Sequence, residues 1–265
     1  MSASTAQVAI FGDLDADLWG LVIGGERPRV AVAGLTDADV ALEPADLDLA
    51  DPDVWTLAAA GCALRIERAD ATTSSDDGDG SLEPCRVSGS ATVAGAEREF
   101  DIGGVRSAAP VAGDLDSLRL FGTWFPAGHE IALVSARPRG GKGHDRDSVG
   151  VVARGEEHPL VIDPRLSTTY DAHGAPRRVG LELWLGDDED GDQWPRRVAG
   201  AATGSHVNGA LGGHALGALG GHALSGSSRR GAAGDAAGVA LDAYAFQCVS
   251  RAEPGAGVYL LLRSA

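Results

Sequence analysis

The sequence predicts an all-β protein in which one antiparallel unit occurs twice. Apolar and polar residues alternate along most of the chain, with turn signals every ten residues or so. A set of matched residues also recurs after about 110 positions. Because short alternating strands with frequent turns are typical of sandwiches and barrels, the two observations together predict two tandem barrel or sandwich units.

The repeat has two parts. Ile10-Phe11-Gly12 precedes Arg27-Pro28-Arg29, and Leu120-Phe121-Gly122 precedes Arg137-Pro138-Arg139 at the same spacing, a shift of 121 − 11 = 110. Ten more residues recur at a shift of 187 − 76 = 111: Asp76, Asp77, Asp79, Gly80, Pro84, Arg86, Val87, Gly89, Ala91 and Thr92 match Asp187, Asp188, Asp190, Gly191, Pro195, Arg197, Val198, Gly200, Ala202 and Thr203. One net insertion of a single residue between the two parts accounts for the change in shift from 110 to 111. We therefore predict a first unit over residues 1–110 and a second over residues 111–265.

Individual strands follow from the alternation. Val179, Leu181, Leu183 and Leu185 are separated by Gly180, Glu182 and Trp184, which predicts a strand with one buried face. The same pattern occurs at residues 64–68, 244–248 and 258–262. Only residues 37–49 are compatible with a helix, and Pro44 interrupts that segment.

Composition excludes several classes of protein. The chain has 265 residues, of which 44% are hydrophobic, and a net charge of −16 from 22 basic and 38 acidic residues. Such a charge repels phosphate backbones, so we expect no nucleic-acid partner.

Cys62, Cys85 and Cys248 are too few and too far apart for a disulfide framework, and the apolar surroundings of Cys85 and Cys248 predict burial. The start of the chain does not resemble a signal peptide, and no apolar run approaches the ~20 residues of a membrane span. We therefore expect a cytoplasmic protein without membrane insertion.

Residues 205–232 form a low-complexity Gly/His-rich insert in the second unit. His206, His214 and His222 recur every eight residues, which is compatible with a metal-binding tract or with an expanded surface loop. No acidic or cysteine ligand lies among these histidines, so we predict a loop. The acidic loops at residues 76–80 and 187–192 lack the glutamate that closes an EF-hand calcium loop. We predict neither a metal site nor a cofactor.

Candidate ligand-binding residues are those that distinguish the second unit from the first. Trp124 and His129 flank an aromatic turn, and His144 and Asp145 lie in the polar loop of residues 140–147. Tyr170 and Trp184 complete the set of aromatic and titratable side chains expected to line a pocket. Trp184 is expected on the strand face opposite Val179, where it would line a cleft. The chain has neither a phosphate loop nor a Gly-x-Ser-x-Gly elbow, so the residues identify no catalytic group and leave open whether the protein is an enzyme.

Two segments resemble a known family. Ala91-Thr-Val-Ala-Gly-Ala-Glu-Arg-Glu-Phe100, followed by Gly103-Gly-Val-Arg-Ser107, is similar to a strand pair and glycine–arginine element of the two-lobed lipocalin-like proteins related to AttH and carotenoid 1,2-hydratase. Asp163–Tyr170 resembles strands of the second lobe of that family. The His-Ser-Trp-Gly sequence that usually continues the element is absent here. The resemblance implies two lipocalin-like lobes that bind or transform an apolar, terpenoid-like molecule in a cleft between them.

Two functions remain open at this point. The first is binding or modification of a small apolar molecule in a cleft of the duplicated β scaffold. The second is a non-enzymatic structural or protein-interaction role. An enclosed apolar cavity larger than about 300 Å³ favours the first, because ligand pockets have that size. The oligomeric state is not predictable from these residues.

Overall fold

The computed structural model describes residues 7–38, 40–70, 73–74, 82–107, 115–138, 148–154, 161–185, 195–211 and 239–264. Regular structure in these ranges consists of antiparallel strands, so the all-β prediction is confirmed. The first strands are β1 (Val8–Asp13), β2 (Leu18–Ile23), β3 (Arg29–Ala33), β4 (Glu43–Asp48), β5 (Val54–Ala59), β6 (Cys62–Arg68), β7 (Thr73–Ser74), β8 (Leu82–Val93) and β9 (Ala96–Ser107). They are followed by β10 (Leu115–Trp124), β11 (Glu130–Pro138), β12 (Ser148–Arg154), β13 (Val161–Tyr170), β14 (Pro176–Leu185), β15 (Arg196–Leu211), β16 (Val239–Ser250) and β17 (Glu253–Ser264). Within the described ranges, no helix is long and apolar enough to span a membrane.

The first unit is a closed barrel of eight strands. Its strands pair in the order β1-β2-β3-β4-β5-β6-β8-β9, and β9 returns to pair with β1. Inward-facing side chains from all sides of the barrel form one buried cluster, which includes Phe11, Val22, Trp55, Ile66 and Val87. These residues alternate with outward-facing ones along their strands, as expected for a small barrel filled by its own side chains.

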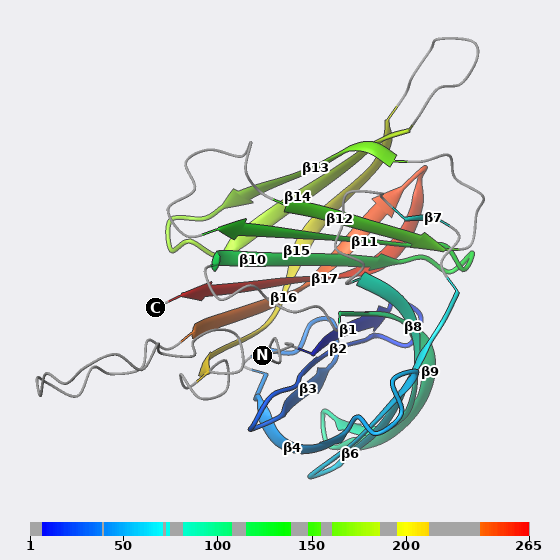
Figure 1. The fold of residues 1–265 in the computed structure, drawn as a ribbon, viewed down its shortest axis with the longest axis vertical. Coiled ribbons are helices and arrows are strands. Elements are labelled where there is room, and N and C mark those ends of the chain that lie inside the picture. The colour runs from blue at the N-terminus through cyan, green and yellow to red at the C-terminus, as the bar shows by residue number, and fades with distance from the viewer. Residues whose placement is uncertain are drawn as a thin grey trace, which may run out of the picture.

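The second unit is a curved nine-stranded sheet in the order β13-β14-β15-β16-β17-β10-β11-β12-β7 (Figure 1). Eight of its strands follow the barrel in the sequence, from Leu115 onward, but β7 precedes β8 of the barrel and pairs with β12. Phe121, Leu181, Phe246 and Tyr259 belong to the apolar cluster on its inner face. The two barrel-like sheets fit a duplicated lipocalin-like fold.

A third apolar cluster joins the two units. Ile10 and Trp19 of the barrel pack in one cluster with Leu120, Trp124 and Leu260 of the second sheet. Strands β1 and β17 therefore have one face in a unit interior and the other in this inter-lobe core. Burial on both faces explains why β17 reads as a nearly continuous apolar run from residue 256 to residue 262 rather than as a clean alternation.

Repeated residues occupy corresponding positions in the two units. Phe11 and Phe121 both point into their own unit, whereas Ile10 and Leu120 both face the inter-lobe core. Arg86 lies on β8 between β6 and β9, and Arg197 lies on β15 between β14 and β16. The residues paired with them in register, Glu67 and Glu182, are both glutamates.

The structure settles one open alternative and corrects one expectation about local structure. Residues 43–48, part of the segment compatible with an interrupted helix, form strand β4, and Pro44 is compatible with this position because it lies at the sparsely paired start of the strand. The Gly/His-rich insert does not begin at residue 205, since β15 continues to Leu211. Ser205 and Val207 are buried, so tertiary packing outweighs the glycine-rich composition at this end of the insert. The rest of the insert, from residue 212, lies outside the described residues.

Candidate functional site

The first barrel has a recess where β3 and β4 separate. Only Arg29 and Val30 of β3 pair with β4, through Pro44 and Glu43. Beyond that point β3 continues alone on this side, while the chain from Gly34 crosses toward β15, where the Val40 amide donates to the His206 carbonyl at 3.2 Å. The recess that results has a volume of about 540 Å³, within the usual range of small-molecule sites.

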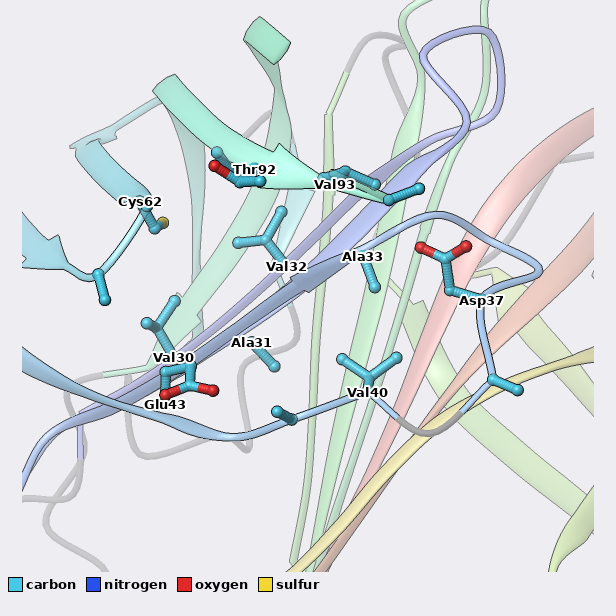
Figure 2. A pocket seen from close by; sticks show the side chains of 16 residues that line it. Val30, Ala31, Val32, Ala33, Asp37, Val40, Glu43, Cys62, Thr92 and Val93 are labelled. Carbon is cyan, nitrogen blue, oxygen red and sulfur yellow. The ribbon is translucent and has the colours of Figure 1, made fainter. Parts of the chain in front are cut away.

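Most of the side chains that line this recess are apolar, while polar atoms make up about half of its accessible wall. Figure 2 shows Val32 between the β3 ribbon and Thr92, with Cys62 and Val93 at the same end of the barrel. The recess is lined by Val30, Ala31, Val32, Ala33, Asp37, Ala38, Val40, Ala41, Glu43, Ala60, Gly61, Cys62, Ala91, Thr92, Val93 and Ala94. Among the residues that the structure describes, Asp37 and Glu43 are the charged members of this lining, which includes no Lys or Arg. The recess is therefore suited to a neutral or cationic molecule that has both apolar and polar surface.

Cys62 contributes apolar wall rather than a nucleophile. Burial raises the pKa of its thiol to about 11, so the thiolate is a very small fraction near neutral pH. The other two cysteines, Cys85 and Cys248, are completely buried, as predicted. Burial also raises the pKa of the Cys248 thiol, to about 12.

The opposite end of the barrel is closed by Arg106. Its guanidinium lies 5.0 Å from the ring centroid of Trp55 and donates from Nε to Glu83 at 3.0 Å. It also donates to the carbonyls of Asp53 and Pro52, at 3.1 Å and 2.8 Å. Because Glu83 and Val93 lie at opposite ends of β8, the barrel has one plugged end and one recessed end.

The described members of the predicted ligand set do not converge. Trp124 lies in the inter-lobe core, where its ring fills the space left by Gly12 and Gly122. His129 is buried at the β10–β11 turn, stacked on Phe125 with ring centroids 4.4 Å apart. Its Nδ1 lies 3.6 Å from a carboxylate oxygen of Glu253.

Tyr170 and Trp184 lie on opposite faces of the β13–β14 hairpin. The Tyr170 hydroxyl points inward, 3.4 Å from the hydroxyl of Tyr259. Trp184 is half-buried on the outer face, with the Arg165 guanidinium 5.4 Å from its ring centroid. His144 and Asp145 lie outside the described residues. The aromatic residues singled out in the sequence thus belong to several local environments.

The recess residues were not identified from the sequence. Val30–Ala33 is recognisable as a strand, but pairing between β3 and β4 stops after two residues, and no sequence signal marks that point. Gly61 supplies the only available hint, because it occupies a left-handed turn (φ +69°) at the rim of the recess.

Comparisons with known proteins support the fold. No family model matches the chain, and no curated protein matches it. Among solved structures, the chain is similar to kievitone hydratase from Nectria haematococca, with a TM-score of 0.52 and 11% sequence identity. The match covers 99% of this chain and 89% of that protein. The likeness extends over both units and concerns the architecture alone.

Proposed function

We propose that the protein binds a small, mostly apolar molecule in the recess between β3 and β4, and that it is a divergent relative of the two-lobed lipocalin-like proteins. The observation that carries the proposal is the recess itself: about 540 Å³ of space at one end of a closed barrel, lined mainly by apolar side chains with polar atoms among them. The similar solved structure is that of a hydratase, so it supports a small-molecule role only by analogy of fold. Whether binding is followed by a reaction is a separate question: the described lining offers the carboxylates of Asp37 and Glu43 and the Cys62 thiol, whose raised pKa disfavours the thiolate.

Charge narrows the class of ligand. Asp37 accepts a 2.7 Å hydrogen bond from the Gly34 amide, which holds its carboxylate at the edge of the recess. Glu43 lies at the other side of the opening (Figure 2). A ligand carboxylate would have to approach both side chains without a compensating base in the lining. A neutral terpenoid alcohol is therefore expected to bind better than the corresponding acid.

A matched pair of ligands tests the proposal. Farnesol and farnesoic acid have the same hydrocarbon chain and differ in charge at pH 7.5, and each can be titrated into the full chain by calorimetry. We expect farnesol to bind at least tenfold more tightly, a difference of about 1.4 kcal/mol. Equal affinities would contradict the assignment of the carboxylate rim.

Blocking variants locate the site. Val32→Phe and Thr92→Trp place bulk inside the recess and at its rim, and both should weaken farnesol binding at least tenfold. Ala58→Phe adds the same kind of bulk to β5 of the same barrel, outside the recess lining. It should leave the affinity unchanged, with far-UV circular dichroism used to verify folding of all three variants. Farnesol binding that survives both blocking variants would place the ligand elsewhere.

A further inference from the structure

The edge of β3 beyond Val30 is open toward the recess. β3 pairs with β4 only at Arg29 and Val30, whereas its pairing with β2 continues as far as Ala33. Val32 lines the recess and lies in the part of β3 that has β2 on one side and, among the described residues, no strand on the other. A strand edge of this kind presents backbone N–H and C=O groups that no neighbouring strand pairs.

The alternation of hydrogen bonds along β3 determines which backbone groups face the recess. The Ala45 amide donates to the Pro28 carbonyl at 3.0 Å, so residue 28 directs its carbonyl toward β4. The next residue, Arg29, lies opposite Pro44, which has no N–H and suits a pair without hydrogen bonds. Because successive residues direct their backbone groups to alternate sides of a strand, the even-numbered residues of β3 face the β4 side. Val32 is the even-numbered residue beyond the last pair, so its N–H and C=O groups face the recess.

Contacts with the second unit hold the returning chain away from this edge. In a regular continuation of the β3–β4 hairpin, Ala41 would lie opposite Val32. The Val40 amide instead donates to the His206 carbonyl of β15 at 3.2 Å, and Val40 and Leu42 pack against the inter-lobe core. The opening beside Val32 is therefore held by packing between the units.

The two carboxylates of the lining lie toward opposite ends of the open edge. Asp37 follows the end of β3 and accepts a hydrogen bond from the Gly34 amide, whereas Glu43 pairs with Val30 at the other end. A ligand that exchanges two hydrogen bonds with Val32 runs antiparallel to β3, so its amino end lies toward Asp37 and its carboxyl end toward Glu43. A free carboxylate at that end would approach Glu43, and the described lining contains no Lys or Arg to compensate it.

We infer that the recess takes a short, apolar N-acyl amino-acid amide, which adds one residue to the open edge of β3. The ligand N–H donates to the Val32 carbonyl, and the Val32 N–H donates to the ligand carbonyl, as in recognition by strand addition. The apolar groups of the ligand pack against the alanine and valine side chains of the lining. This inference rests on the proposed function, because it specifies the class of ligand for the same recess.

Three small molecules test the inference when each is titrated into the full chain by calorimetry at neutral pH. N-hexanoyl-leucine methylamide has the required N–H and C=O groups. Its depsipeptide analogue has an ester oxygen in place of the leucine N–H, and N-hexanoyl-leucine ends in a free carboxylate. We expect the amide to bind about fivefold more tightly than the depsipeptide, the usual effect of one hydrogen bond, and about tenfold more tightly than the acid.

Two variants at Val32 separate the backbone contribution from that of the side chain. Val32→Pro removes the N–H at a strand edge, where proline is tolerated, and Val32→Ala shortens the side chain but keeps the N–H. Val32→Pro should bind the amide about fivefold less tightly than Val32→Ala. The two variants should bind farnesol alike, and far-UV circular dichroism verifies that both are folded.

Hydrogen exchange on the wild-type chain provides a readout that needs no variant. In the free protein the Val32 N–H should exchange about tenfold faster than the Val30 N–H, and the amide ligand should slow exchange at Val32 selectively. Equal affinities for amide and depsipeptide, or equal protection of Val32 and Val30 in the free protein, would overturn the inference. If farnesol still binds in the recess, either result leaves the proposed function intact, whereas a chain that binds neither farnesol nor the amide would contradict both.

Discussion

At the scale of single residues, Arg106 is the most constrained charged side chain described. It is 2% exposed and combines the contact with Trp55, the ion pair with Glu83 and two hydrogen bonds to backbone carbonyls. A buried charge is tolerated only when partners of this kind satisfy it, and its removal leaves those partners unsatisfied. Arg106 belongs to the Gly103–Ser107 segment, which resembles the glycine–arginine element of the two-lobed lipocalin-like proteins. In this chain the residue has a structural role at the closed end of the barrel.

Arg106→Met is therefore expected to be strongly destabilising. The variant removes the guanidinium but keeps an apolar stem, and we expect a loss of about 2–4 kcal/mol in the free energy of unfolding. Urea denaturation provides the measurement. Arg86→Met is the control, because Arg86 is exposed and its ion pair with Asp101 should contribute less than about 1 kcal/mol. Similar losses for the two variants would refute the proposed role of Arg106.

The thiol of Cys62 provides a prediction about pH. Its pKa of about 11 means that the thiolate fraction in the folded protein rises about tenfold per pH unit between pH 7 and pH 10. The rate of iodoacetamide labelling at Cys62 should follow that slope without a plateau. In urea the same thiol should return to an ordinary pKa of about 8.5, and its rate should level off above pH 9. A plateau near pH 9 in the folded protein would show that Cys62 is not buried as described.

At the scale of elements, the end of β15 determines which part of the Gly/His-rich segment contributes to stability. The Trp19 indole N–H donates to the Ser205 hydroxyl at 2.8 Å, and Val207 packs in the inter-lobe core. Deletion of residues 205–232 removes both, and should lower the free energy of unfolding by roughly 3 kcal/mol or more. Deletion of residues 212–232 spares both and should cost less than about 1 kcal/mol, since shortening a glycine-rich connection has a small entropic effect. Thermal unfolding of the two deletion variants distinguishes these cases, and equal losses would contradict this boundary.

Elements differed in how well the sequence predicted them. Strand β14 was predicted because Val179, Leu181 and Leu183 alternate with residues that face the other side of the sheet. The prediction placed a loop from residue 205 onward because the composition there is rich in glycine. The chain instead stays extended in β15, because Val207 packs in the core shared with the other unit. Local composition carries no information about a partner surface contributed by residues almost 200 positions away. The candidate site was missed for a related reason: the recess depends on where pairing of β3 with β4 stops, and that point is set by three-dimensional packing.

At the scale of the whole molecule, the two units share a core and are expected to unfold together. Trp124 contacts groups from both units, including Gly12 and Gly103 of the barrel and Gly122 of the second sheet. Trp124→Ala should cost about 3–5 kcal/mol and should reduce hydrogen-exchange protection in both units. Val179→Ala is the comparison: Val179 lies in the cluster of the second sheet, but because the units unfold together this variant should also lower protection in the barrel. Loss of protection confined to one unit in Trp124→Ala would show that the units are energetically independent.

Intermolecular NMR contacts test the central claim, that the β3–β4 recess of the first barrel holds an apolar ligand. With valine methyl groups labelled and farnesol bound, we expect nuclear Overhauser effects from the ligand to Val30, Val32 and Val93, which line the recess. No effect is expected at Val179 or Val198, which lie inside the second sheet. Contacts confined to the second sheet, or saturable binding without any contact to the three recess valines, would contradict the account.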